Sequence, residues 1–226
     1  MNGRRNFILA AFTRFELLVT VAVVVVLLLA VLPTLMKPEM RVKALNCVNL
    51  QKQIGLSFRL WSGDHRDKMP PQVSTNNGGT KELLLSGLGY PHFLVMSNEL
   101  GSPWNLRCFS DAQRTPATNF AGLRNSNISY FVVPEADETV PDLWLSGDRN
   151  LATNNGALSS GLFTMPTNLE MSWTSQLHIN KGNICFADGS VQQFGSAGTL
   201  QRSVTNAVRA YRDSTADVTT LRLIFP

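Results

Sequence analysis

Charged residues are scarce in this chain of 226 residues: Asp, Glu, Lys and Arg make up 16% of it, and the formal net charge is +4. The mean hydropathy is close to zero, so the composition excludes a highly charged disordered protein and a polytopic membrane protein. The Lys and Arg residues are scattered, with no run of five or more. An extended phosphate-binding patch is therefore absent from the sequence pattern, and we expect no nucleic-acid partner.

The sequence also lacks the short motifs of common enzymes. It contains no Gly-x-Ser-x-Gly, no His-Glu-x-x-His and no phosphate-binding loop, and its three histidines are not clustered. We predict that the chain is not an enzyme, with no small-molecule substrate evident, and an anchored hydrolase is the least supported function.

Cysteine is rare as well. Cys47, Cys108 and Cys185 cannot all pair within one chain, so an exported form allows one disulfide and one free thiol, and the pairing stays open. Because no Cys-x-x-Cys occurs, the sequence supports neither a structural zinc site nor a thioredoxin-like site, and we expect no bound metal.

One apolar block near the N-terminus is hidden by these averages. In residues 17–36, Thr20 is the only polar residue before Pro33, and a helix of this length spans about 30 Å, enough to cross a bilayer core. Arg4 and Arg5 precede the block, which predicts a cytoplasmic N-terminus and an exported remainder. No good small-x-small cleavage site follows it, which disfavours an ordinary cleaved signal and leaves an ordinary signal anchor open.

The segment 11–19, Ala-Phe-Thr-Arg-Phe-Glu-Leu-Leu-Val, resembles the cleavage and methylation segment of type IV prepilins and type II secretion pseudopilins. The resemblance implies that prepilin peptidase cuts between Ala11 and Phe12, and that the new amino group of Phe12 is N-methylated. It also implies that Glu16 neutralises the N-terminal amine of a neighbouring subunit during assembly, which pairs two charges in apolar surroundings.

Pro33 supports the resemblance, because pilin-like helices commonly carry a helix-loosening proline at this distance from the cleavage site. Two residues depart from the family pattern: Ala11 stands where glycine is usual, and Arg14 where an apolar residue is usual. The resemblance implies a pilin-like α+β fold. Its long N-terminal helix has a transmembrane half and a periplasmic half and packs on a small antiparallel sheet with irregular loops.

The expected organisation has four parts: a prepilin leader peptide 1–11, a transmembrane and assembly helix 12–36, a periplasmic continuation of the helix 37–66, and a globular α+β head 67–226. Gly63 and Asp64, followed by Pro70 and Pro71, predict the end of the helix. The implied location is the bacterial inner membrane, crossed once with the head in the periplasm, and then a filament.

Shorter segments resemble pilin-like proteins of planctomycetes and verrucomicrobia. They are Cys-Val-Asn-Leu-Gln-Lys-Gln-Ile-Gly-Leu at 47–56, Arg-Cys-Phe-Ser-Asp at 107–111, Asp-Arg-Asn-Leu at 148–151, and the H-x9-DG signature formed by His178, Asp188 and Gly189. The Asp-Gly pair predicts a tight hairpin turn. A catalytic or metal-binding His–Asp pair is disfavoured, because a turn aspartate and a strand-edge histidine explain both residues.

Regular elements of the head follow from apolar periodicity. We expect a short helix at 81–87, strands at 128–133, 173–179, 184–187, 190–194 and 218–225, and a helix carrying Leu200, Val204, Val208 and Tyr211.

The segment 135–148 carries the acidic residues Glu135, Asp137, Glu138, Asp142 and Asp148. Some pseudopilins bind calcium, but the spacing matches no EF-hand loop, so a solvated acidic loop is the better interpretation and no cofactor is expected.

The favoured function is a structural subunit of a type II secretion pseudopilus or a type IV pilus-like filament. Its expected partners are prepilin peptidase, identical or related pilin-like subunits, and the inner membrane. The alternative is a membrane-anchored periplasmic binding module, for instance for polysaccharide, that does not polymerise.

Overall fold

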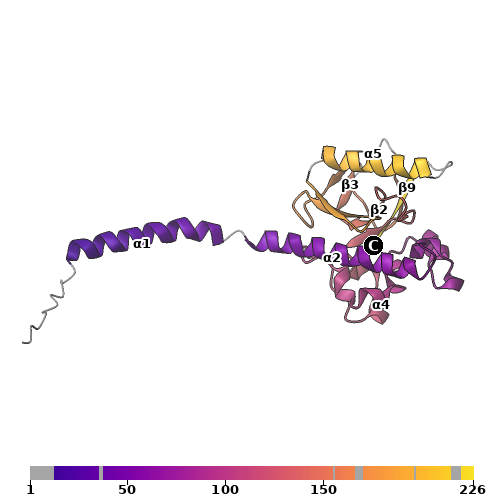
Figure 1. Ribbon diagram of the computed structural model, residues 1–226, viewed down its shortest axis with the longest axis horizontal. Helices are drawn as coiled ribbons and strands as arrows, with labels where there is room; N and C mark the ends of the chain where they lie inside the picture. The colour runs from indigo at the N-terminus through magenta and orange to yellow at the C-terminus, as the bar shows by residue number, and fades with distance from the viewer. Residues whose placement is uncertain (1–12, 36–37, 155, 166–169, 196, 215–219) are drawn as a thin grey trace, which may run out of the picture. The chain divides into compact units, whose positions relative to one another are not determined.

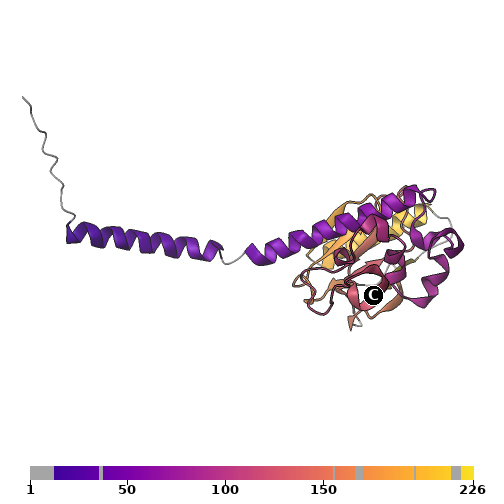
Figure 2. The same cartoon turned by 90° about the horizontal axis from the view of Figure 1, so that it is seen from below.

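The computed structural model describes residues 13–35, 38–154, 156–165, 170–195, 197–214 and 220–226, without the side chains of 30–35 and 38–41. The chain divides into two compact units, Met1–Val42 and Lys43–Pro226. Figure 1 and Figure 2 show the elements of each unit from two directions. The boundary lies inside the segment expected as a helical continuation, and the expected leader lies outside the described residues.

The first unit contains helix α1 (Arg14–Leu35) and the first residues of helix α2 (Pro38–Gly63). No glycine interrupts α1, and its proline comes only in the last turn. Proline lacks the N–H that an interior helical turn needs, and α1 ends two residues after Pro33. Proline is well tolerated in a first turn, and α2 begins at Pro38.

No helix in the described part of the chain combines the length and the apolarity needed to span a bilayer. The predicted fold class is therefore wrong in its long N-terminal helix with a transmembrane half: two helices stand where the sequence predicts one. A single-pass inner-membrane anchor has no support in these helices.

Within the second unit, α2 is amphipathic. Its buried side chains recur every three or four residues along one face, as a helix packed on a core requires. They are Cys47, Leu50, Gln51, Ile54, Ser57, Phe58, Trp61 and Ser62. The helix ends at Gly63, where the sequence predicts its end.

The larger sheet of the second unit has six antiparallel strands. Their order across the sheet is β5 (Gly161–Met165), β9 (Leu221–Phe225), β1 (Tyr130–Val132), β2 (Trp144–Asp148), β7 (Gly182–Phe186) and β8 (Val191–Phe194). A smaller antiparallel sheet has the order β4 (Gly156–Ala157), β3 (Leu151–Thr153) and β6 (Met171–Trp173).

Two hydrophobic clusters cover the two faces of the larger sheet. Along β1, Tyr130 and Val132 belong to the cluster that contains the buried face of α2, whereas Phe131 belongs to the cluster of α5 (Ala197–Ser214). Alternate side chains of a strand point to opposite faces, so this segregation places the two helices on opposite sides of the sheet. Figure 1 shows the same three layers.

Short helices connect α2 to the sheet. They are η1 (Pro70–Gln72), η2 (Thr75–Asn77), η3 (Lys81–Ser86), α3 (Tyr90–Leu94), α4 (Ser97–Leu100), η4 (Pro103–Leu106), η5 (Phe120–Gly122) and η6 (Asn125–Asn127). The helix expected at 81–87 is the 3-10 helix η3.

The strands expected at 128–133, 184–187, 190–194 and 218–225 correspond to β1, β7, β8 and β9, and the expected C-terminal helix is α5. The strand expected at 173–179 is wrong beyond Trp173, because the chain turns there after β6. Strands β2, β3, β4 and β5 are additional to the predicted ones. The small and polar residues of β2 and β3 gave no apolar alternation to recognise.

Candidate functional site

The expected processing site, Ala11 and Phe12, lies outside the described residues. Next to it, Thr13 and Glu16 form a reciprocal cap on the N-terminus of α1. The Glu16 N–H donates to Thr13 Oγ1 at 3.3 Å, and the Thr13 N–H donates to Glu16 Oε2 at 3.0 Å. This is a capping box, whose Thr-x-x-Glu signature is present in the sequence and went unused in predicting a role for Glu16. The hydrogen bonds from the Thr13 backbone and hydroxyl lower the pKa of Glu16, so its carboxylate is charged at neutral pH.

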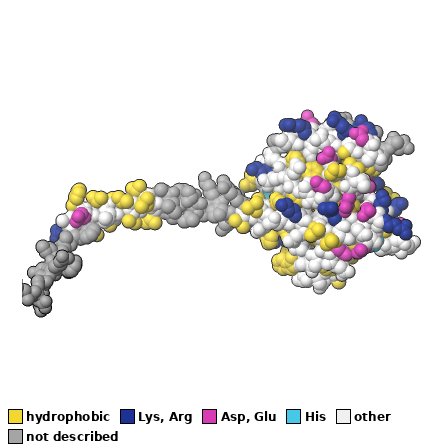
Figure 3. Space-filling view, viewed as in Figure 1, with side chains coloured by type: hydrophobic (Ala, Val, Ile, Leu, Met, Phe, Trp, Pro, Cys, Tyr) yellow, Lys and Arg dark blue, Asp and Glu magenta, His cyan; other side chains and the backbone are white. Residues whose placement is uncertain are grey.

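The described surface of α1 is apolar and uncovered. Every side chain from Thr13 to Leu29 is exposed, including Phe15 at 75% and Leu18 at 69%. Figure 3 shows these apolar side chains along the helix, with one acidic side chain near its start. A helix that is apolar on all sides is ordinarily covered on all sides, so α1 needs a partner surface.

In the second unit, four side chains form what we call the cysteine–histidine cluster: Cys47, Cys108, Asp148 and His178. Cys47 of α2 and Cys108 form a disulfide with a Cα–Cα distance of 5.3 Å, and Cys185 is a buried free thiol. His178 Nε2 lies 3.4 Å from Cys108 Sγ and 3.3 Å from Asp148 Oδ2. Each of the four residues comes from a different segment that resembles pilin-like proteins, and the fold brings these four segments together at one place.

The carboxylate of Asp148, at the end of β2, is fully buried and accepts hydrogen bonds from two neighbouring elements. Gln51 Nε2 of α2 donates to Oδ1 at 3.0 Å, and the Asn183 backbone N–H and Nδ2 of β7 donate to Oδ2 at 2.7 and 2.9 Å. Buried charge requires such partners. The two amide side chains therefore fix the orientation of Asp148 toward His178.

A buried ion pair follows the cluster residue Asp148 directly in the sequence. Arg149 donates from Nε and Nη2 to the two oxygens of Asp111, each at 2.7 Å. Burial acts to raise the pKa of Asp111, but the hydrogen bonds and charge of Arg149, together with bonds from Ser129 and Gln113, lower it below its ordinary value. The bidentate geometry links the 107–111 segment to the end of β2.

The cysteine–histidine cluster does not have the geometry of a nucleophilic triad. In a triad, the carboxylate contacts one ring nitrogen of histidine and the nucleophile contacts the other. Here Asp148 and Cys108 both face Nε2 of His178, and the sulfur of Cys108 is bonded to Cys47. The cluster thus places two sulfurs and one ring nitrogen close together and does not form a proton relay.

The H-x9-DG signature is divided between two places. Among the described hydrogen bonds and ion pairs, none joins His178 to Asp188. Asp188 and Gly189 form the tight turn between β7 and β8, with Gly189 at φ +82°, which confirms the predicted hairpin. His178 is buried in a turn and is not a strand-edge residue, and Ile179 after it has φ +53°, a rare conformation for a β-branched residue.

Residues at intervals of four along α2 lie against the β7–β8 hairpin and the neighbouring cluster. Cys47 and Gln51 reach the cluster, and Gly55 lies so close to Cys185 that an added Cβ would stand 2.6 Å from its sulfur. Arg59 then donates to the Asp188 backbone oxygen at 3.1 Å. The resemblance at 47–56 therefore corresponds to a helix face that docks on the signature hairpin.

The acidic segment is paired rather than solvated. Glu135 is buried against Arg222, Asp137 lies 3.9 Å from Lys68, and Glu138 lies 3.6 Å from Arg59. The interpretation as a solvated loop is wrong for these residues and for Asp148, and it fits only the exposed Asp142. Their pairing with side chains from other elements could not be read from local spacing.

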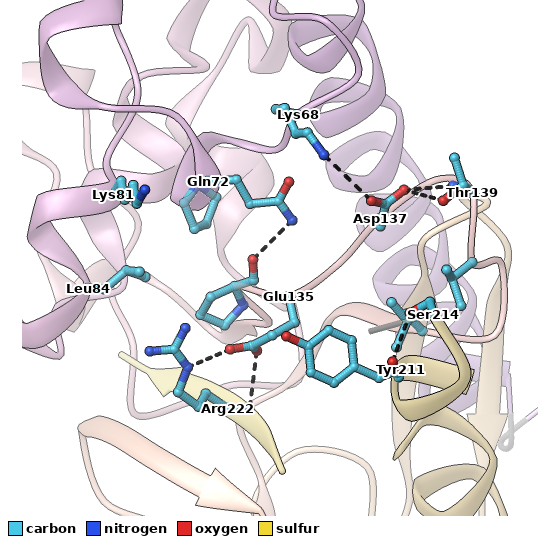
Figure 4. Close-up of a pocket in the computed structure, with 14 residues that line it drawn as sticks. Lys68, Gln72, Lys81, Leu84, Glu135, Asp137, Thr139, Tyr211, Ser214 and Arg222 are labelled. Atoms are coloured by element: carbon cyan, nitrogen blue, oxygen red, sulfur yellow. Dashed lines mark hydrogen bonds and ion pairs between the residues drawn. The ribbon is translucent and has the colours of Figure 1, made fainter. Parts of the chain in front are cut away.

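Some of these residues line a pocket of about 460 Å³ (Figure 4). Lys68, Lys81 and Arg222 contribute positive charge, and Glu135 and Asp137 contribute negative charge. Within the described part of the chain, Lys81 has no ion-pair partner, and Figure 4 shows no dashed line to it. The pocket is thus a polar recess with one available cation.

The ligand atoms of Cys47, Cys108 and His178 lie within 4.8 Å of one another. Sequence spacing gave no signal for this group, because its members are far apart in the chain. Comparison of the chain with known protein families, curated proteins and solved structures finds no match. The function therefore has to be argued from the chain itself.

Proposed function

We propose that the chain is a structural subunit of a pilin-like filament, a type II secretion pseudopilus or a type IV pilus-like fibre. The observation that carries the proposal is the uncovered apolar surface of α1, with a charged Glu16 at its start. Packing of α1 against the same helix of neighbouring subunits covers that surface on all sides. The second unit, Lys43–Pro226, which we call the head from here on, is stabilised by its own core and stays outside these helix–helix contacts.

Processing follows from the same proposal. Prepilin peptidase removes residues 1–11, and the amino group of Phe12 is methylated. The new N-terminus then lies one residue before Thr13, whose N–H already binds the Glu16 carboxylate. Glu16 is thus held close to the N-terminus of its own helix, where it can also meet the amine of an adjacent subunit.

Intact mass spectrometry of the chain purified from its own cells tests the processing step. The expected mass is that of residues 12–226 plus one methyl group. An unmodified chain that still carries residues 1–11 contradicts the proposal. The measurement does not depend on any substitution and therefore cannot be confused with misfolding.

Assembly is tested by separating the charge of Glu16 from its role in the cap. Gln is accepted at this position of a capping box, so Glu16→Gln keeps the cap and removes the charge. Thr13→Ala removes the cap and keeps the charge. We expect Glu16→Gln to lower the fraction of the chain in sedimentable filaments at least about 10-fold, and Thr13→Ala to retain most of it. The reverse result would assign Glu16 to capping alone.

A second candidate function, a binding module that does not polymerise, is favoured by the pocket in Figure 4. The unpaired Lys81 suits an acidic ligand such as a carboxylate-bearing oligosaccharide. Calorimetric titration of such sugars into the purified chain tests this function. Binding that is lost in Lys81→Ala and kept in Lys52→Ala, an exposed lysine of α2, would favour it.

A further inference from the structure

The cysteine–histidine cluster contains the ligand types that zinc prefers. The sulfurs of Cys47 and Cys108 and a ring nitrogen of His178 lie within 4.8 Å of one another. Asp148 Oδ2 lies 3.3 Å from His178 Nε2, but it is not a member of this group and already accepts two hydrogen bonds from Asn183. Two sulfurs and one imidazole make up three ligands of a zinc site, which leaves the fourth position to water.

The spacing of these atoms fits a tetrahedral site. With a zinc–sulfur distance of about 2.3 Å and a zinc–nitrogen distance of about 2.1 Å, adjacent sulfur and nitrogen ligands of a tetrahedral site lie about 3.6 Å apart. The observed separation of His178 Nε2 from Cys108 Sγ is 3.4 Å. Only the two sulfurs, which are bonded to each other, must separate.

We propose that reduction of the Cys47–Cys108 disulfide converts the cluster into a zinc site. A dithiol transfers two electrons and two protons to the disulfide, which becomes two thiols, while the dithiol itself is oxidised to a disulfide. Zn²⁺ then displaces one proton from each thiol and binds the two thiolates and His178 Nε2, with water as the fourth ligand. The site and the disulfide are alternative links between α2 and the rest of the second unit.

The surroundings of the cluster orient its ligands without a metal. Gln51 and Asn183 hold Asp148 by three hydrogen bonds of 2.7 to 3.0 Å. Such outer contacts set ligand direction in zinc sites, and their loss ordinarily weakens metal affinity 10- to 100-fold. The side chain of His178 is only 4% exposed.

The test uses the full chain, reduced with a dithiol that is then removed without air, and zinc is titrated against a chromophoric chelator. We expect one zinc per reduced chain and none per oxidised chain. Cys47→Ser and His178→Ala should each weaken binding more than about 10-fold. Cys185→Ser, which alters the buried thiol outside the cluster, should bind zinc as the natural chain does. A reduced natural chain that binds no zinc overturns the proposal.

Cobalt supplies a readout that needs no variant. Tetrahedral cobalt bound to two thiolates gives sulfur-to-metal charge-transfer bands, which the reduced natural chain should show and the oxidised chain should lack. Asn183→Ala leaves the three ligands in place and removes one support of Asp148, which contacts His178, so the bands should remain while affinity falls about 10-fold. Zinc binding without thiolate bands would place the metal elsewhere and would also overturn the proposal.

Discussion

Helix α1 and the head differ in the exposure of their apolar side chains. The head buries its apolar side chains in two clusters around a sheet and joins distant segments by a disulfide and buried ion pairs. The described part of α1 exposes its apolar side chains, and the hydrogen bonds of its described side chains join residues three apart. The head therefore buries its own apolar surface, whereas the described side chains of α1 leave theirs exposed.

Replacing both cysteines of the disulfide should have the largest effect on the head. The bond closes a separation of 61 residues, for which chain entropy predicts a loss of about 4 kcal/mol in the free energy of unfolding of Cys47→Ser/Cys108→Ser. Urea unfolding followed by tryptophan fluorescence measures the loss. Cys185→Ser is the matched control, and an equal loss in both would show that the disulfide contributes nothing of its own.

Asp111→Ala should cost slightly less, about 3 kcal/mol, because it leaves the guanidinium of Arg149 buried without its carboxylate partner. The comparison with α1 is direct: Glu16→Ala removes a carboxylate from an exposed helix and should leave unfolding of the head unchanged. Both variants are measured by urea unfolding at pH 7. Destabilisation of the head by Glu16→Ala would contradict the independence of the two units.

The stability of the head should also fall between pH 7 and pH 5. Burial lowers the pKa of His92 from 6.5 to about 4, and its Nε2 has no hydrogen-bond partner. Below pH 6.5 His92 binds a proton in the unfolded chain but not in the folded chain. The free energy of unfolding therefore falls as the pH falls from 6.5 toward 4. The expected loss between pH 7 and pH 5 is about 2 kcal/mol.

His92→Gln should flatten this part of the stability curve, measured by urea unfolding at several pH values. His65 is only half-buried, so His65→Gln serves as the control variant and should keep the slope of stability against pH. A slope that survives His92→Gln would assign the acid response to another group.

The smallest effect is expected at the start of α1. Thr13→Ala removes the hydroxyl that accepts from the Glu16 N–H and donates to the Glu16 carboxylate, while the backbone N–H of residue 13 still donates to that carboxylate. Loss of a capping side chain costs about 1 kcal/mol of local helix stability. Amide hydrogen exchange should rise in the first turn of α1 and stay unchanged in β1 and β2. Faster exchange in those strands would contradict the local character of α1.

Local patterns predicted much of the fold. Alternation identified β1, β7 and β9, the Asp-Gly pair identified the turn at Gly189, and helical spacing identified α5. The failures have physical causes. The segment after Trp173 is apolar enough for a strand, but it turns to bury His178, which a period-two pattern cannot foresee.

The candidate site was predictable only in pieces. Each of Cys47, Cys108, Asp148 and His178 lies in a segment that drew attention by resemblance, yet no spacing indicated that they meet. Their meeting depends on the order of β2 and β7 in the sheet and on the docking of α2, which are long-range properties. The disulfide pairing stayed open for the same reason. The role of Glu16 in a cap, by contrast, was available in four consecutive residues.

The disulfide has one further consequence, for proteolysis. It closes a covalent ring from Cys47 to Cys108, which contains the second half of α2 and the short helices η1 to η4. A protease that cuts once inside this ring, for example after the exposed Lys68 or Lys81, releases no fragment. The nicked chain keeps its full mass in a non-reducing gel and separates into two pieces only after reduction, so the gel itself reports whether the ring is closed.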